Sequence, residues 1–200
     1  MLRALAGLAL GAWAGMPGAR AAAQPVWQVW RRDEALLVQA RVPLELPPAL
    51  HEALLRGVAL TFVWQAELRR PRWYWTDRVL LGARRTVRLT YQPLTQRWRL
   101  SVSDGAAADE PGAALQRVLD TLQEALALVR SSQQWRIALP PALRGDERLE
   151  LAFFLDTGRL PRPLQWLSGV EGVPPLAWRT ALPLATVPTA EPPQEAEEPA

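Results

Sequence analysis

The 200-residue sequence has no cysteine, no lysine and only one histidine, His51. Without cysteine the chain has no disulfide bond, no thiol nucleophile, no thiolate metal ligand and no cysteine for lipid attachment. A single histidine does not support a zinc site of the usual histidine-rich kind, and no glycine-rich phosphate loop of either common form is present. We therefore predict no metal and no cofactor. His51 is expected on a short helix, beside rather than within its apolar face.

Long apolar runs are also scarce, and the strongest one lies at the N-terminus. A short positive start that ends at Arg3 precedes an apolar run over residues 4–16 and a small-residue segment that ends at Ala23. This order is typical of a secretory signal peptide, and the run is shorter than the roughly 20 residues that span a bilayer. We predict a cleaved signal peptide over residues 1–23 and a periplasmic mature chain, with an uncleaved inner-membrane anchor as the alternative.

Charge of one sign is not in large excess. The 23 basic residues are all arginine and are balanced by 20 acidic residues, so a nucleic-acid partner is not expected. Residues 186–200 contain four glutamates and four prolines. Such a segment buries too little apolar surface to fold, and we predict a disordered tail. Residues 24–185, with nine of the ten tryptophans, are expected to form a single domain.

Alternation of apolar and polar residues predicts β-strands along most of this domain. Residues 58–68 are the clearest case, because every second residue from Leu60 to Leu68 is apolar. A hairpin is expected from residues 85–91 and 97–102, in which Val87, Leu89 and Tyr91 face Trp98, Leu100 and Val102. A second hairpin is expected to turn at residues 32–34. Further strands are expected over residues 72–77, 135–139, 148–155 and 176–184.

Two segments predict helices instead. Residues 47–57 begin with two prolines and end at Gly57, where glycine adopts a left-handed cap at little cost. Residues 110–130 have Pro111 suited to a first turn and Asp109 or Glu110 suited to a cap. They carry apolar residues at helical spacing: Leu115, Val118, Leu119, Leu122, Leu126 and Val129. Together the patterns predict an α+β, β-dominated fold, an antiparallel sheet or sandwich with two packed helices.

The motif Asp156-Thr157-Gly158 follows an apolar strand, as the catalytic loop of an aspartic protease does. Such enzymes need two of these loops, so that two carboxylates share one proton. No second Asp-Thr-Gly or Asp-Ser-Gly occurs in the sequence, so only a homodimer would supply the partner. A dimeric aspartic-type hydrolase that uses Asp156 is therefore the alternative, and we favour Asp156 and Thr157 as caps of a turn. Pro161 and Pro163 predict a stiff, extended crossing after that turn.

A longer stretch around this motif resembles a known family. Residues 153–165, FFLDTGRLPRPLQ, and the LAWR at residues 176–179 resemble an uncharacterised family of exported proteobacterial proteins, known only as a domain of unknown function. Residues 53–77 resemble that family's helix, strand and aromatic run, and residues 84–100 its hairpin. Members are often encoded beside a sensor kinase of the nitrogen-regulation type. The resemblance implies a role in the cell envelope and no catalytic residue.

The segment ELRRPRWYWTDR, residues 67–78, is the candidate binding face. It interleaves arginines with large rings: Arg69, Arg70, Arg72, Trp73, Tyr74, Trp75 and Arg78. On a strand this order presents guanidinium groups on one face and rings on the other. The partner would be an envelope protein, an anionic lipid headgroup or a glycan. For this segment we favour the structural interpretation, in which Trp73 and Trp75 face the core while the arginines protect a sheet edge. We favour a non-enzymatic binding or interaction module in the envelope.

Overall fold

Nine β-strands in two antiparallel sheets make up the framework of the computed structural model, which describes residues 24–74, 76–105, 114–165 and 176–189. The smaller sheet has the order β1 (Val26–Arg32), β2 (Ala35–Arg41) and β7 (Ser131–Ala138). The larger sheet has the order β6 (Ala114–Leu119), β5 (Arg97–Gly105), β4 (Arg78–Gln92), β3 (Leu60–Arg70), β8 (Arg148–Leu155) and β9 (Ala177–Pro183). The β-dominated α+β class is confirmed.

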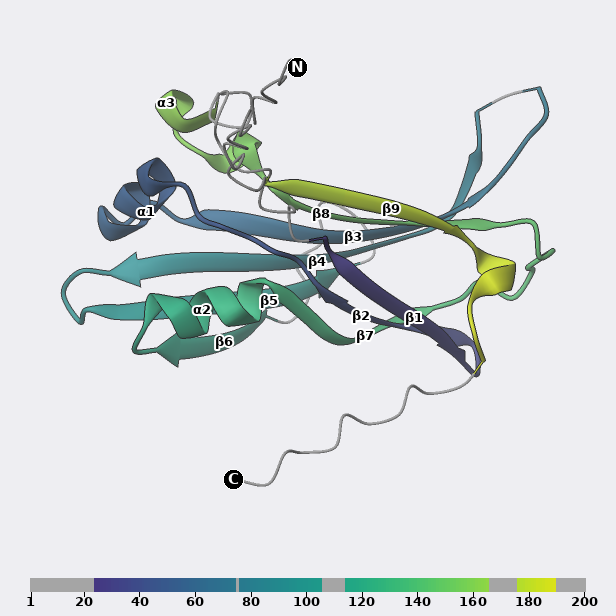
Figure 1. Cartoon of the computed structure of the whole chain (residues 1–200), viewed down its shortest axis with the longest axis horizontal. Coiled ribbons are helices and arrows are strands. Elements are labelled where there is room, and N and C mark those ends of the chain that lie inside the picture. The colour runs from purple at the N-terminus through teal and green to yellow at the C-terminus, as the bar shows by residue number, and fades with distance from the viewer. Residues whose placement is uncertain (1–23, 75, 106–113, 166–175, 190–200) are drawn as a thin grey trace, which may run out of the picture.

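The two sheets pack face to face, and the core lies between them (Figure 1). The alternating apolar residues of β3, which are Leu60, Phe62, Trp64, Ala66 and Leu68, are at most 1% exposed. Trp64 contacts Phe153 of β8 within its own sheet and Trp27 of β1 in the other sheet, with ring centroids 4.4 and 5.7 Å away. Large rings therefore join the layers at the centre of the molecule, and the predicted inward face of residues 58–68 is confirmed.

Both predicted hairpins are confirmed. The β4–β5 pair has the expected register, since Val87, Leu89 and Tyr91 lie opposite Val102, Leu100 and Trp98. The β1–β2 pair turns at Asp33, which has a φ of 53°. Aspartate adopts this left-handed conformation more readily than most residues, so the turn forms at the predicted place.

Helix α1 (Pro48–Leu55) is also confirmed, and it lies at one end of the sandwich (Figure 1). Its buried residues are Leu50, Ala53 and Leu54, and His51 lies beside them, partly exposed. The helix stops where Gly57 takes a φ of 85°, a conformation that favours glycine.

The predicted helix over residues 110–130 is wrong in its first half. Residues 114–119 form β6, which pairs with β5, and helix α2 spans only Leu122–Val129. The Thr121 hydroxyl accepts a hydrogen bond from the Glu124 amide at 3.2 Å and caps α2 at its start. Pairing with a neighbouring strand therefore overrides the helical spacing of the preceding residues. Pro111, Asp109 and Glu110 lie outside the described residues.

The predicted extended crossing after Asp156 is also wrong. A 3₁₀ turn (η1, Thr157–Arg159) is followed by the short helix α3 (Arg162–Gln165). The Leu164 amide donates to the Pro161 carbonyl at 2.8 Å. Proline fits the first turn of a helix, where its missing N–H needs no intrahelical partner, so the two prolines start a helix here.

The packed chain continues beyond β9. A second 3₁₀ turn (η3, Leu184–Thr186) buries Leu184, and Val187 is buried after it. The Arg31 amide donates to the Pro188 carbonyl at 2.7 Å. These contacts extend a few residues past the boundary expected at 185.

Residues 1–23 and 190–200, with the predicted signal peptide and most of the predicted tail, lie outside the described part. No helix among the described residues has the length and apolarity to cross a membrane.

Candidate recognition site at the β3–β4 hairpin

The connection between β3 and β4 projects from one end of the sandwich (Figure 1, upper right). Strand β3 ends at Arg70, directly before Pro71, which has no N–H to continue the ladder. Near this end the pairing shifts by one residue: Leu68 lies opposite Leu81 and Arg69 opposite Val79. The extra residue in β4 is a β-bulge, and bulges bend and twist a strand. The bulge accounts for the departure of the hairpin end from the plane of the sheet.

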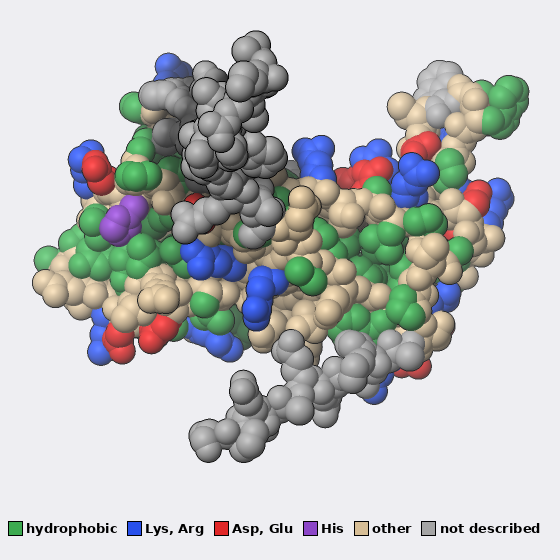
Figure 2. Space-filling view, in the orientation of Figure 1, with side chains coloured by type: hydrophobic (Ala, Val, Ile, Leu, Met, Phe, Trp, Pro, Cys, Tyr) green, Lys and Arg blue, Asp and Glu red, His purple; other side chains and the backbone are tan. Residues whose placement is uncertain are grey.

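The tip of this hairpin, residues 71–77, carries exposed rings. Trp73 is 94% exposed and Tyr74 is 64% exposed. The two rings contact each other edge to face, with centroids 4.9 Å apart. In the space-filling view the same projection bears hydrophobic side chains at its end (Figure 2). The tip contains no strand among its described residues, and placing Trp73 in the core is wrong, because this part of the chain lies beyond the two sheets. Trp75 lies outside the described residues.

Arg69 anchors the base of the hairpin on the outer face of the larger sheet. Its guanidinium donates to Glu67 on the same strand and forms an ion pair with Glu150 of β8, 3.1 Å away. The Glu67 carboxylate also accepts a hydrogen bond from Gln65. Hydrogen bonding to Glu67 raises the pKa of Arg69 further above its ordinary value. Glu67 and Glu150 lie directly opposite each other, so Arg69 bridges two like charges and offsets part of their repulsion.

Arg70 anchors the base on the other side, through the buried carboxylate of Glu147. The guanidinium nitrogens Nε and Nη2 lie 3.1 and 2.6 Å from Oε1 of Glu147, whose side chain is 0% exposed. Nη2 also donates to the Ala142 carbonyl at 2.8 Å. The amides of Arg144 and Gly145 donate to the same carboxylate at 2.7 and 2.8 Å. Among the described residues, every polar contact of this buried charge therefore comes from the turn before β8 or from the end of β3.

The pKa of Glu147 reflects these contacts. Burial disfavours the charged form and on its own raises the pKa. The hydrogen bonds from Arg144, Arg70 and Gly145 outweigh burial and lower the pKa from 4.5 to about 2. Glu147 is thus a permanent anion at neutral pH that holds Arg70. The sequence did not single out this residue, and its only local signal was a glycine-containing turn directly before a strong strand.

The arginines of the predicted face therefore divide into two groups. Arg69 and Arg70 are held in ion pairs at the base. Arg72 and Arg78 are exposed near the tip and form no ion pair among the described residues, although Arg78 lies opposite Arg70 in the ladder. The structure does not arrange guanidinium groups and rings on two faces of one strand. It brings the rings to the tip, with two exposed arginines beside them.

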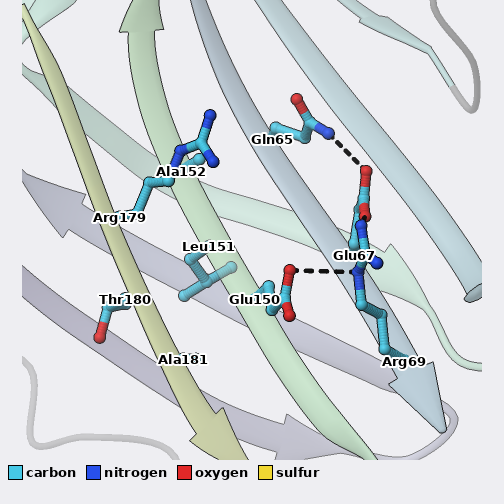
Figure 3. Close-up of a pocket in the computed structure, with 9 residues that line it drawn as sticks. All are labelled: Gln65, Glu67, Arg69, Glu150, Leu151, Ala152, Arg179, Thr180 and Ala181. Carbon is cyan, nitrogen blue, oxygen red and sulfur yellow. Dashed lines mark hydrogen bonds and ion pairs between the residues drawn. The ribbon is translucent and has the colours of Figure 1, made fainter. Parts of the chain in front are cut away.

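A shallow polar hollow of about 390 Å³ lies on the outer face of β3, β8 and β9, next to the hairpin base (Figure 3). Its polar lining is Gln65, Glu67, Arg69, Glu150, Arg179 and Thr180. Figure 3 shows Arg179 extending from β9 toward Ala152 on β8, apart from the Glu67 and Glu150 carboxylates. Those two carboxylates are both bound by Arg69. The side chains that line the hollow therefore form an ion-pair network that supports the hairpin base, and the two carboxylates are not free acids.

Asp156 lies at the end of β8 with two arginines. Its Oδ2 is 3.5 Å from Nη2 of Arg84 and 3.3 Å from Nε of Arg159. The Asp156 amide donates to the Thr61 carbonyl at 2.8 Å, which fixes the turn against β3. The side chain accepts no capping hydrogen bond in the turn that follows. Among the described residues, no group of three or more histidines, cysteines or acids is placed to hold a metal ion.

Fold and surface together define a class: an antiparallel β-sandwich that projects an aromatic hairpin tip. Sequence comparison shows that the chain belongs to the family described as a domain of unknown function (DUF4390), whose model matches residues 26–170. The match covers the chain from β1 to α3 and ends before β9. No curated protein and no solved structure gives a significant match. The resemblance to a domain of unknown function is confirmed, and export, proteobacterial origin and the neighbouring kinase stay predictions.

Proposed function

We propose that this protein is a non-enzymatic binding module of the cell envelope and that the tip of the β3–β4 hairpin is its recognition element. The observation that carries the proposal is Trp73, a large apolar side chain that is 94% exposed on a projecting loop. Burying a side chain of this kind stabilises a fold or a complex by roughly 1.5–3 kcal/mol, and the exposed Trp73 does not contribute this free energy in the isolated protein. Tryptophan, tyrosine and arginine are also the residues that most often dominate binding interfaces.

The base of the hairpin supports this role because it is held from both sides. Arg69 bridges Glu67 and Glu150, and Arg70 is bound to the buried Glu147. A recognition element that is ordered before binding loses less conformational entropy when it binds. The ion pairs at the base therefore favour a preorganised tip over a loop that orders only in the complex.

The location in the envelope rests on the N-terminal sequence. Residues 1–23 have the order of a secretory signal peptide, and the family resemblance also implies export. We place the mature chain in the periplasm, where its partner is another envelope component. Cell fractionation and the N-terminal mass of the purified protein check this location.

Binding to washed envelope fractions of the source organism tests the role of the tip. The double variant Trp73→Ala/Tyr74→Ala is expected to lose about tenfold or more in apparent affinity, because two aromatic contacts are removed. Leu94→Ala is the matched control: Leu94 is 101% exposed in the β4–β5 turn, and this variant is expected to bind as the wild type does.

Two results would contradict the proposal. Undiminished binding by the double variant would show that the tip is not the recognition element. If the wild type cleaves an envelope protein and Asp156→Asn does not, the result would instead support the hydrolase. Under our proposal, Asp156→Asn is expected to bind as the wild type does.

A further inference from the structure

We propose that the hairpin tip docks on a lipid bilayer that carries anionic headgroups, with the rings of Trp73 and Tyr74 in the interfacial region and Arg72 and Arg78 at the headgroups. This inference rests on the proposed function, because it names the partner of the same tip. The proposed partner of the tip is a membrane surface and not a second protein. Three features of the tip favour that choice: its shape, its rings and its charge.

The shape of the tip does not suit a protein interface. A stable protein interface buries about 800 Å² on each partner, whereas two aromatic side chains bury about 150–250 Å² each. The tip projects from the sandwich as a single loop (Figure 1), so it offers little area around its rings. A bilayer needs no complementary pocket, because it surrounds any apolar group that enters it. A narrow projection with rings at its end therefore suits insertion better than docking.

The kind of ring also matters. Tryptophan and tyrosine are enriched where proteins meet the membrane–water interface, because each combines an apolar body with a polar N–H or O–H. The contact between Trp73 and Tyr74 holds them together as one exposed apolar unit. The tip is short, so it reaches the interface and does not span the bilayer.

The charge around the rings is suited to anionic lipid. Within residues 71–78 the charged side chains are Arg72, Asp77 and Arg78, a net charge of +1. Arg72 and Arg78 are exposed, and neither forms an ion pair among the described residues. Arg69 and Arg70, in contrast, are already neutralised at the base by Glu67, Glu150 and Glu147. Arginine side chains also extend to headgroups while their stems lie against apolar surface.

The absence of cysteine from the chain gives a direct test, since one introduced cysteine carries a fluorescent probe at a single site. Thr76→Cys places an environment-sensitive dye in the tip, and Leu94→Cys places it in the exposed β4–β5 turn as the control. The chain from Gln24 onward is mixed with vesicles of phosphatidylcholine, alone or with phosphatidylglycerol. A cooperative unfolding transition checks that every variant is folded.

With phosphatidylglycerol present, we expect a blue shift and a rise in emission at position 76 and no change at position 94. Trp73→Ala/Tyr74→Ala is expected to abolish the change. Each of Arg72→Gln and Arg78→Gln is expected to weaken vesicle affinity about fivefold, which corresponds to about 1 kcal/mol for an arginine near an anionic surface. Added salt is expected to weaken it as well.

An equal response to both kinds of vesicle would overturn the role of anionic headgroups. No response to either kind, while envelope binding still depends on Trp73 and Tyr74, would overturn the membrane partner and leave a protein or glycan partner for the tip. If neither vesicles nor envelope fractions bind through the tip, both the inference and the proposed function fail.

Discussion

Glu147 and Arg70 form the contact on which the position of the hairpin most depends. The carboxylate is fully buried and the guanidinium is 14% exposed. Removing one partner of a buried pair leaves an uncompensated charge, which costs more free energy than the intact pair contributes. A single residue that lies 77 positions away in sequence thus fixes the end of β3.

We expect Glu147→Gln to lower the free energy of unfolding by about 3 kcal/mol at neutral pH, because Arg70 then lacks its buried counter-charge and keeps only the exposed Asp146, 3.9 Å away. The pKa of Glu147 is lowered from 4.5 to about 2 in the fold, so the unfolded chain binds the proton more readily. The contribution of the carboxylate is therefore fully present above about pH 5 and is lost as the pH falls toward 2.

Urea unfolding of both proteins across this pH range measures the effect. The difference between wild type and Glu147→Gln should be largest at neutral pH and should shrink as the solution is acidified. A difference that stays constant with pH would mean that the charge of Glu147 is not the source of the stability.

The strands could be predicted from the sequence because their signal is local. Alternation in β3 and the register between β4 and β5 follow from residues close together in the chain. The prediction of a helix before α2 was wrong because the spacing of Leu115, Val118 and Leu119 fits a helix as well as it fits a strand. Only pairing with β5 selects the strand, and that pairing is tertiary. The Thr121-to-Glu124 capping pattern marked the true start of the helix.

The candidate site was predictable in its residues but not in its arrangement. The interleaved arginines and rings of residues 67–78 suggested two faces of one strand. Pro71 and the nearby bulge instead end the strand, so Trp73 lies in solvent. The ion pairs of Arg69 with Glu150 and of Arg70 with Glu147 could not be predicted from a local pattern, since both glutamates come from a distant part of the chain. Only Glu67, two residues before Arg69, is local.

Arg85 joins β4 to the other sheet and gives a prediction for packing between the two layers. Its Nε and Nη2 bind the Asp104 carboxylate at 2.6 and 2.8 Å, and Nη1 donates to the Ser132 hydroxyl and the Gln133 carbonyl of β7. The guanidinium also lies over the ring of Trp135, 5.7 Å from its centroid.

We expect Arg85→Lys to lower the free energy of unfolding by about 1–2 kcal/mol, because an ammonium group cannot form the two-pronged contact and the stacking together. Arg88→Lys is the matched control, since Arg88 lies three residues further along β4 and is exposed. It should change stability by less than about 0.5 kcal/mol. Equal effects in the two variants would show that Arg85 does not tie the sheets together.

The two layers are unequal, and the C-terminal segment closes one of their ends. Six strands face three, which leaves Leu115 of the edge strand β6 exposed although it lies on the core side of the larger sheet. At the hairpin end, the Leu184 amide donates to the Glu147 carbonyl at 2.8 Å, and Leu184 and Val187 are buried. Residues 184–189 therefore support the same turn that holds Arg70, so the C-terminal segment contacts the turn that anchors the base of the β3–β4 hairpin.

Two truncations measure the contributions of residues 184–189 and of the acidic tail to stability separately. Deletion of residues 190–200 is expected to change the free energy of unfolding by less than about 0.5 kcal/mol, as the prediction of a disordered tail implies. Deletion of residues 184–200 also removes Leu184 and Val187 and is expected to cost about 3 kcal/mol or more, at about 1.5–3 kcal/mol for each buried side chain. Urea unfolding measures both.

Because the Glu147 turn loses a hydrogen bond in the longer deletion, amide exchange near residues 144–147 should also accelerate in that variant alone. A large loss of stability in the shorter deletion would instead place residues 190–200 within the cooperative fold and contradict the prediction of a disordered tail.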